Sequence, residues 1–96
     1  MLSVVIITKN EEKNIKKCVE PLLNWVDEII VADSKSTDKT IDILKDFNSS
    51  KIKIHSVDWL GFAKTKNNAI ELAQGDWILS LDADEVVTNE LKLEIL

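Results

Sequence analysis

Residues that mark specialised protein classes are scarce in this sequence of 96 residues, which contains one cysteine, one proline and two glycines. The single cysteine, Cys18, excludes an internal disulfide and is typical of a protein in a reducing compartment. With two glycines there is no glycine-rich phosphate loop, which excludes the P-loop and dinucleotide-binding folds. No apolar run approaches the roughly 20 residues of a membrane span. The N-terminus also lacks the basic segment of a signal peptide.

Basic residues are fewer than acidic ones, 12 against 17, and the formal net charge is -5. A nucleic-acid-binding protein would show a basic stripe, so we expect no nucleic-acid partner. An acidic protein can still hold a phosphate group if a metal ion bridges the two. The hydrophobic content of 45% is that of an ordinary globular protein, and the length allows one small domain. We expect a cytoplasmic protein, with peripheral contact at the inner face of a membrane left open.

Four apolar or β-branched runs recur at similar spacing and are expected to be strands: residues 2–8, 28–33, 51–57 and 77–82. The segments between these runs have helical periodicity. Strand–helix alternation of this regularity indicates βαβ units with right-handed crossovers. The predicted fold class is therefore α/β, with three α/β/α layers, a mostly parallel sheet, and about four strands and four helices.

We expect one helix in each segment that follows a strand: one capped by Asn10, one over residues 37–47, one over residues 62–74, and one from Thr88 to the end of the chain. Glu11 and Glu12 would then lie in the first turn of the first helix, where the helix dipole favours acids. Pro21 should end or kink that helix near Val19, and Gly75 should stop the third helix. Three side chains are interpreted as core residues: Cys18, Trp25 and Trp77.

Polar residues follow three of the four expected strands: residues 8–11, 33–38 and 82–85. In a parallel sheet these segments lie at one edge, outside the carboxyl ends of the strands, where α/β proteins bind ligands. Asp82 and Asp84 repel each other unless a cation lies between them, and carboxylate oxygens favour Mg²⁺, Mn²⁺ or Ca²⁺. Each segment alone is also explained by a turn or a helix cap; Ser36, Thr37 or Asp38 would cap the second helix. Their coincidence at one edge favours a metal site and, through it, a phosphate-bearing substrate.

Other residues near this edge have more than one interpretation. Lys66 either meets a phosphate or pairs with a carboxylate of the edge, whereas Lys64 is explained by a solvated helix face. Trp59 either packs in the core or walls a pocket. His55 is interpreted as structural or exposed, because the sequence has no second histidine to support metal ligation.

Four segments carry a resemblance to a known family. Residues 3–12, 31–40 and 75–85 resemble the successive motifs of family 2 glycosyltransferases of the GT-A fold. Residues 59–69 are similar to the form in the branch that includes lipopolysaccharide core glucosyl- and heptosyltransferases. The resemblance implies a nucleotide-sugar donor, commonly a UDP-sugar, a glycan or lipid-linked acceptor, and transfer with inversion at the anomeric carbon.

The resemblance also implies roles for individual residues. The nucleotide would be bound by seven of them: Thr8, Asn10, Glu11, Asp33, Lys66, Asn67 and Asp82. Asp33 would accept a hydrogen bond from the base, since a carboxylate only accepts and uracil offers an N–H. Asp82 and Asp84 would bind the Mg²⁺ or Mn²⁺ that bridges the diphosphate and, as a Lewis acid, stabilises charge on the leaving group.

Two features depart from the family pattern. Lys35 stands where the family usually has glycine, and a positive φ there would strain the turn. Family members also continue well beyond the metal motif and carry an acidic general base that no residue here matches. We therefore expect residues 1–96 to be one donor-binding domain, the donor half of such an enzyme. With the family's strand order 3-2-1-4, residues 77–81 form an open apolar edge, from which we expect self-association.

Two other functions compete with a glycosyltransferase. The first is a nucleotide-binding subunit without catalysis, which pairs with another polypeptide. The second is a phosphatase of the haloacid-dehalogenase type, with the first aspartate as nucleophile. That class places its Asp-x-Asp motif early in the chain, whereas only twelve residues follow Asp84 here, so it is the weaker alternative.

Overall fold

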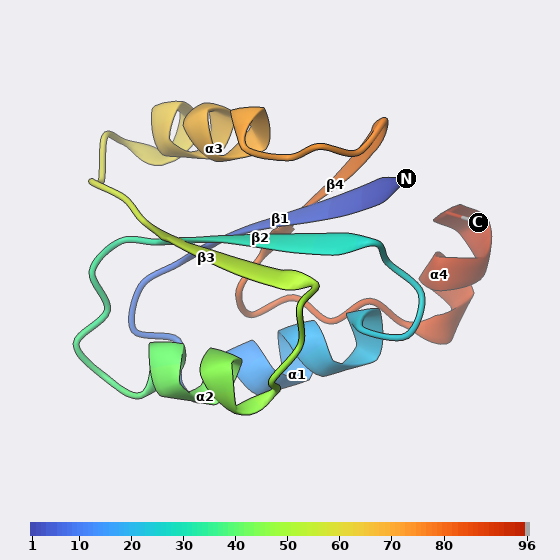
Figure 1. The fold of residues 1–96 in the computed structure, drawn as a ribbon, viewed down its shortest axis with the longest axis horizontal. Helices are drawn as coiled ribbons and strands as arrows, with labels where there is room; N and C mark the ends of the chain where they lie inside the picture. The colour runs from blue at the N-terminus through green and yellow to red at the C-terminus, as the bar shows by residue number, and fades with distance from the viewer. Residues whose placement is uncertain (96) are drawn as a thin grey trace.

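Four parallel strands form the middle layer of the computed structural model, which describes residues 1–95 (Figure 1). They are β1 (Leu2–Thr8), β2 (Glu28–Asp33), β3 (Ile52–Ser56) and β4 (Trp77–Asp82). Their order is β3-β2-β1-β4, and each neighbouring pair is parallel. The predicted strand positions and the 3-2-1-4 order are confirmed.

Helices cover both faces of the sheet (Figure 1). One face carries α1 (Ile15–Val19), the 3-10 turn η1 (Glu20–Leu22) and α2 (Thr40–Asp46), and the other carries α3 (Phe62–Glu71). The last helix, α4 (Asn89–Ile95), follows β4; Leu96, to which it was expected to extend, lies outside the described residues. The three-layer α/β/α prediction is confirmed. No helix within residues 1–95 has the length and apolarity needed to cross a membrane.

Burial on both faces explains why β1 and β2 are continuous apolar runs. All six residues of β2 are buried, as are Val4, Val5 and Ile6 of β1. Val4 packs with α1 and η1 on one face, and Val5 packs with Ala69 of α3 on the other. A central parallel strand needs an apolar side chain at consecutive positions, and β-branched residues suit the pleat.

The first helix begins later than predicted. Asn10 does not cap it, because α1 starts at Ile15 with Asn14 at the N-cap, and Glu11 and Glu12 precede its first turn. Asn10 instead adopts a left-handed backbone with φ 54°, a conformation that asparagine tolerates better than most residues. The prediction for Pro21 is confirmed, since α1 ends at Val19 and the chain continues as the 3-10 turn η1.

The other helix boundaries differ for local reasons. α2 begins at Thr40, not at residue 37, and the carboxylate of Asp38 accepts the N–H of Thr40 at 2.9 Å. α3 ends at Glu71, before the predicted stop at Gly75. A Cβ on Gly75 would lie 2.5 Å from Ser3 Oγ and 2.8 Å from Met1 O, so this glycine is required by close packing, not by helix termination.

Trp77 is not a core residue as predicted: it is 75% exposed. The apolar run of β4 resembles that of a central strand, but β4 lies at the end of the sheet order. Trp25 is half-buried and packs against the core, and Cys18 is fully buried in it. Hydrophobicity identified the strand, and the strand order that the resemblance implies placed it correctly at an edge; only the interpretation of Trp77 as a core residue was wrong.

Candidate functional site

The carboxyl ends of β1, β2 and β4 form one edge of the sheet, as predicted. Thr8 is paired in register with Asp33 of β2, and Ile7 with Asp82 of β4. A cavity of about 280 Å³ opens at this edge, and four predicted site residues line it: Thr8, Glu11, Asp82 and Asp84. The structure thus brings half of the predicted site around one cavity.

Other lining residues come from the loops after the strands. Trp59, 54% exposed, walls the cavity, in agreement with the second interpretation of this residue. Ser34 and Phe62 also line it and were not assigned from the sequence. The sequence could have indicated both residues. Ser34 lies within segment 31–40, which resembles the family, and Phe62 lies one helical turn before the predicted site residue Lys66. Asn67 is exposed on α3 and does not line the cavity.

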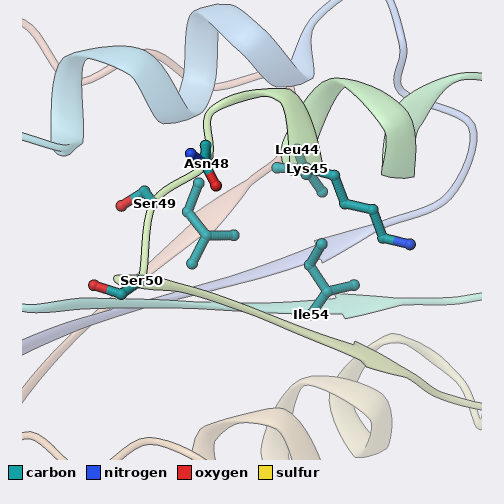
Figure 2. A pocket seen from close by; sticks show the side chains of 7 residues that line it. Leu44, Lys45, Asn48, Ser49, Ser50 and Ile54 are labelled. Carbon is teal, nitrogen blue, oxygen red and sulfur yellow. The ribbon is translucent and has the colours of Figure 1, made fainter.

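A second cavity, of about 420 Å³, lies between α2 and β3 (Figure 2). Leu44 and Ile54 contribute apolar side chains, and Ser49 and Ser50 lie in the loop before β3. Among the described residues, Lys45 is the one ionisable residue that lines it. This cavity is away from the edge where the motif residues gather, and the seven described residues that line it offer no set of groups for catalysis or metal binding.

Asn10 connects the loop after β1 to the loop after β2. Its Oδ1 accepts the N–H of Thr37 at 2.7 Å and of Asp38 at 3.3 Å, and its own N–H donates to Ser36 Oγ at 2.9 Å. The N–H of Glu11 donates to Thr40 Oγ1 at 2.9 Å. These bonds satisfy backbone groups that have no strand or helix partner. The loops at the floor of the site are therefore held to each other.

Asp33 is buried at 4% exposure and holds the turn that follows β2. One carboxylate oxygen accepts the Ser36 N–H at 2.9 Å, and the other accepts the Ser36 hydroxyl. An ionised carboxylate has about four acceptor positions. Asp33 can thus accept a hydrogen bond from a further donor, but the hydrogen bonds that it makes in the structure stabilise the turn.

The condition set out for strain at Lys35 is met, since Lys35 has φ 54°. Its ammonium forms an ion pair with Asp58 at 2.9 Å, with both side chains more than two-thirds exposed. The pair joins the loop after β2 to the loop that carries Trp59. Exposed pairs of this kind contribute little to stability.

The turn that carries the two aspartates is braced by Glu85. Glu85 Oε1 accepts the N–H of Asp82 at 2.8 Å, and the N–H of Glu85 donates to Asp82 O at 3.0 Å. Beneath the turn, the Cys18 thiol donates to Asp82 O at 3.7 Å. Burial raises the pKa of Cys18 to about 12, and the charges of the nearby carboxylates, Glu85 first, add to this. Cys18 is thus a neutral packing residue.

Asp82 and Asp84 fit a divalent cation by their chemistry. Both side chains belong to exposed residues that line the same cavity, and carboxylate oxygens suit Mg²⁺ and Mn²⁺. Lys66 Nζ lies 3.9 Å from Asp82 Oδ1, which shows that a positive charge is accommodated there. In residues 1–95 no three His, Cys, Asp or Glu side chains gather in a metal-binding group. A cation would take its remaining ligands from substrate or water.

Thr8 contributes an unusual polar atom to the floor of the site. The residue is 1% exposed, and its hydroxyl has no hydrogen-bond partner among the described residues. Buried hydroxyls are normally paired, and an unpaired one is destabilising. Thr8 thus combines a buried, unpaired hydroxyl with a place in the lining of the cavity.

The sequence and the fold of this chain are similar to those of known glycosyltransferases. A relative from Rickettsia bellii, described as an uncharacterized glycosyltransferase, is 42% identical over 94 residues, which are 98% of this chain and 31% of the relative. Staphylococcus aureus TarS in complex with UDP-GlcNAc superimposes with a TM-score of 0.80 at 26% identity, covering 98% of this chain and 29% of TarS.

Glucosyl-3-phosphoglycerate synthase from Mycobacterium tuberculosis, with Mn²⁺, UDP and phosphoglyceric acid, superimposes with a TM-score of 0.74 at 25% identity, covering 98% of this chain and 36% of the synthase. The chain thus spans about a third of the length of these proteins. The sequence model described as "Glycosyl transferase family 2" matches residues 3–96. With nearly its whole length matched and the α/β fold of its GT-A structural neighbours, the chain belongs to glycosyltransferase family 2.

Proposed function

We propose that this chain binds a nucleoside-diphosphate sugar, and that the protein it represents transfers the sugar to an acceptor. The observation that carries the proposal is the convergence of Asp82, Asp84 and Thr8 on one cavity, with Lys66 beside Asp82. The complexes of TarS with UDP-GlcNAc and of the synthase with Mn²⁺ and UDP support the donor class. A UDP-sugar is the donor we favour.

Each residue has a chemical task in this proposal. Asp82 and Asp84 would hold Mg²⁺ or Mn²⁺, which when bound supplies Lewis-acid stabilisation of charge on the departing diphosphate. Lys66 would donate to phosphate oxygens as a compact positive charge. Asp33 would accept the N–H of the base with the acceptor capacity that Ser36 leaves. Asn10 and Glu11 would shape the nucleoside site through the loops that they connect, and Asn67 would extend it from α3.

The acceptor side of the reaction forms a second part of the proposal. We favour inverting transfer to a glycan or lipid-linked acceptor, including the lipopolysaccharide core, because residues 59–69 resemble that branch of the family. We place the protein in the cytoplasm, with peripheral contact at the inner membrane face. We assign no general base. Residues 1–96 would form one donor-binding domain, and a nucleotide-binding subunit without catalysis would use the same site.

A titration of the purified chain with UDP, with and without Mg²⁺, tests donor binding by residue-resolved NMR. We expect metal-dependent shifts at Asp33, Lys66 and Asp84. In an Asp84→Asn variant the metal dependence should be lost, because one of two carboxylate ligands is removed. Asp76→Asn is the matched control, since Asp76 is exposed at the other end of β4. A folded chain whose spectrum ignores UDP with the metal present would contradict the proposal.

A further inference from the structure

Lys66 is held between an aromatic ring and a carboxylate. Its ammonium lies 4.9 Å from the centroid of the Phe62 ring and 3.9 Å from Asp82 Oδ1. Phe62 and Lys66 are four residues apart on α3, the spacing at which helical side chains meet. A cation within about 6 Å of a ring face is attracted to it. The ring thus restricts a long, flexible side chain to the side of the cavity on which Asp82 lies.

The ion pair between Lys66 and Asp82 differs from the other ion pairs of the chain in its position at the cavity. Of the ion pairs recorded within residues 1–95, only the Lys66–Asp82 pair includes a carboxylate that lines the cavity. Lys9 is the lysine that lines the cavity itself, and it is exposed, whereas Lys66 lies beside the cavity in contact with Asp82. The Lys66 side chain is 24% exposed and that of Asp82 is 51% exposed. Lys66 is thus the more shielded of the two lysines and the one placed against the aspartate.

We propose that Lys66 is the resident counter-ion of Asp82 in the nucleotide-free site, that Phe62 positions it, and that a nucleoside diphosphate draws it away as a divalent cation takes its place. This inference rests on the proposed function. An ammonium and a divalent cation compete for the same carboxylate, and phosphate oxygens offer the displaced ammonium a new partner. Phe62 is a positioning residue, because it acts through Lys66.

The proposal predicts positive coupling between metal and nucleotide. Without nucleotide, the cation must displace Lys66 and binds weakly. With the diphosphate present, Lys66 is engaged elsewhere and the cation binds more tightly. By linkage, the metal increases the affinity for the nucleotide by the same factor. Because the ion pair is partly exposed, competition from Lys66 should lower the affinity for the metal about two- to fivefold.

Mn²⁺ titration followed by electron paramagnetic resonance tests the competition directly. Without nucleotide, Lys66→Met should bind Mn²⁺ about two- to fivefold more tightly than the unmodified chain. Lys64→Met is the matched control: it removes the same charge from an exposed position of the same helix and should leave the affinity unchanged. Addition of UDP should raise the Mn²⁺ affinity less in Lys66→Met than in the unmodified chain.

Three results would overturn the proposal. The first is that Lys66→Met binds Mn²⁺ with the same affinity as the unmodified chain. The second is that Lys64→Met increases the Mn²⁺ affinity as much as Lys66→Met does. The third is that UDP raises the Mn²⁺ affinity of Lys66→Met as much as that of the unmodified chain. The proposed function fails separately: a chain that binds Mn²⁺ but ignores UDP loses its donor role, whereas the competition at Asp82 is still measured with Mn²⁺ alone.

The role of Phe62 is tested by a double-mutant cycle. Phe62→Leu keeps an apolar side chain and removes the ring, so it should raise Mn²⁺ affinity by less than Lys66→Met does. In the Lys66→Met background it should have no effect, because the positioned group is gone. An equal effect of Phe62→Leu in both backgrounds would assign Phe62 a merely structural role.

A measurement on the unmodified chain covers the case in which the variants fold poorly. Diamagnetic Mg²⁺ added without nucleotide should shift the NMR signals of the Lys66 ε-methylene group and leave those of Lys64 in place. Unmoved Lys66 signals at saturating Mg²⁺ would contradict displacement of the ammonium.

Discussion

Polar side chains at the carboxyl edge of the sheet divide into two groups by what they contact. Asn10 and Asp33 accept N–H groups of the turn after β2, so part of their hydrogen-bonding capacity serves the fold. Asp82 and Asp84 instead line the cavity, where their carboxylates are available to a ligand. Substitution in the first group should therefore disturb stability and binding together, and substitution in the second should mainly disturb binding.

Gly75 offers a test of packing at a single residue. Gly75→Ala should lower the free energy of unfolding by about 1–3 kcal/mol, the usual cost of overpacking. Its Cβ would meet backbone atoms, Met1 O at 2.8 Å and Ser3 N at 2.9 Å, which cannot move aside as a side-chain tip can. Urea unfolding measures the change. Asp76→Ala, at an exposed neighbouring position, should change stability by no more than about 0.5 kcal/mol; an equal loss in both variants would contradict the packing argument.

At the scale of the elements, Glu28 ties together the ends of the sheet opposite the cavity. It is 1% exposed, and its carboxylate accepts hydrogen bonds from Ser3 Oγ at 2.7 Å, Lys53 Nζ at 2.7 Å and the Gln74 N–H at 2.6 Å. These donors belong to β1, β3 and the segment between α3 and β4. A buried charge is tolerated because several donors compensate for its lost hydration. Nothing in the sequence pattern of β2 indicated this cluster.

The Glu28 cluster makes stability depend on pH. Burial raises the pKa of Glu28, but the hydrogen bonds from Gln74, Lys53 and Ser3 outweigh it and lower the pKa below the usual 4.5. A lowered folded-state pKa stabilises the fold above pH 4.5, and this contribution is lost as the pH falls through the folded-state pKa. Glu28→Gln should therefore cost about 1–3 kcal/mol at pH 7 and progressively less below pH 4.5. Urea unfolding at several pH values compares the two chains, and a pH-independent difference would contradict this assignment.

For the whole molecule, the exposed apolar surface at β4 is the main feature that the described residues leave uncovered. Trp77 is 75% exposed and Ile78 is 41% exposed, and β4 is the last strand of the sheet order. Strand edges with exposed apolar side chains pair readily with other chains. This edge supports the expectation of self-association, which stays a prediction.

Sedimentation of the purified chain tests that prediction. We expect the mean mass to rise with protein concentration, and Trp77→Lys should reduce the effect, because a charged side chain on an edge strand opposes pairing. Leu93→Lys is the matched control, since Leu93 is 74% exposed and belongs to the helix α4, not to the strand. A monodisperse monomer at high concentration, or equal effects of both substitutions, would contradict association through β4.

Local sequence pattern was sufficient for the elements and for the place of the site. Consecutive β-branched residues predicted the strands, and their regular alternation with helical segments predicted the parallel sheet. Because all carboxyl ends of such a sheet share one edge, the convergence of Thr8, Asp82 and Asp84 followed from chain order alone. The family resemblance drew attention to Lys35, because it stands where the family usually has glycine, and the structure gives it a positive φ.

Contacts between distant segments decided the rest. The exposure of Trp77, the packing need at Gly75 and the buried cluster around Glu28 all depend on which residues meet across the sheet. The place of Asn10 outside α1 depends on hydrogen bonds to a loop 27 residues away. Hydrophobic periodicity reports the environment of one segment averaged over its own length, and burial and hydrogen-bond partners are properties of pairs of segments that only the folded chain brings together.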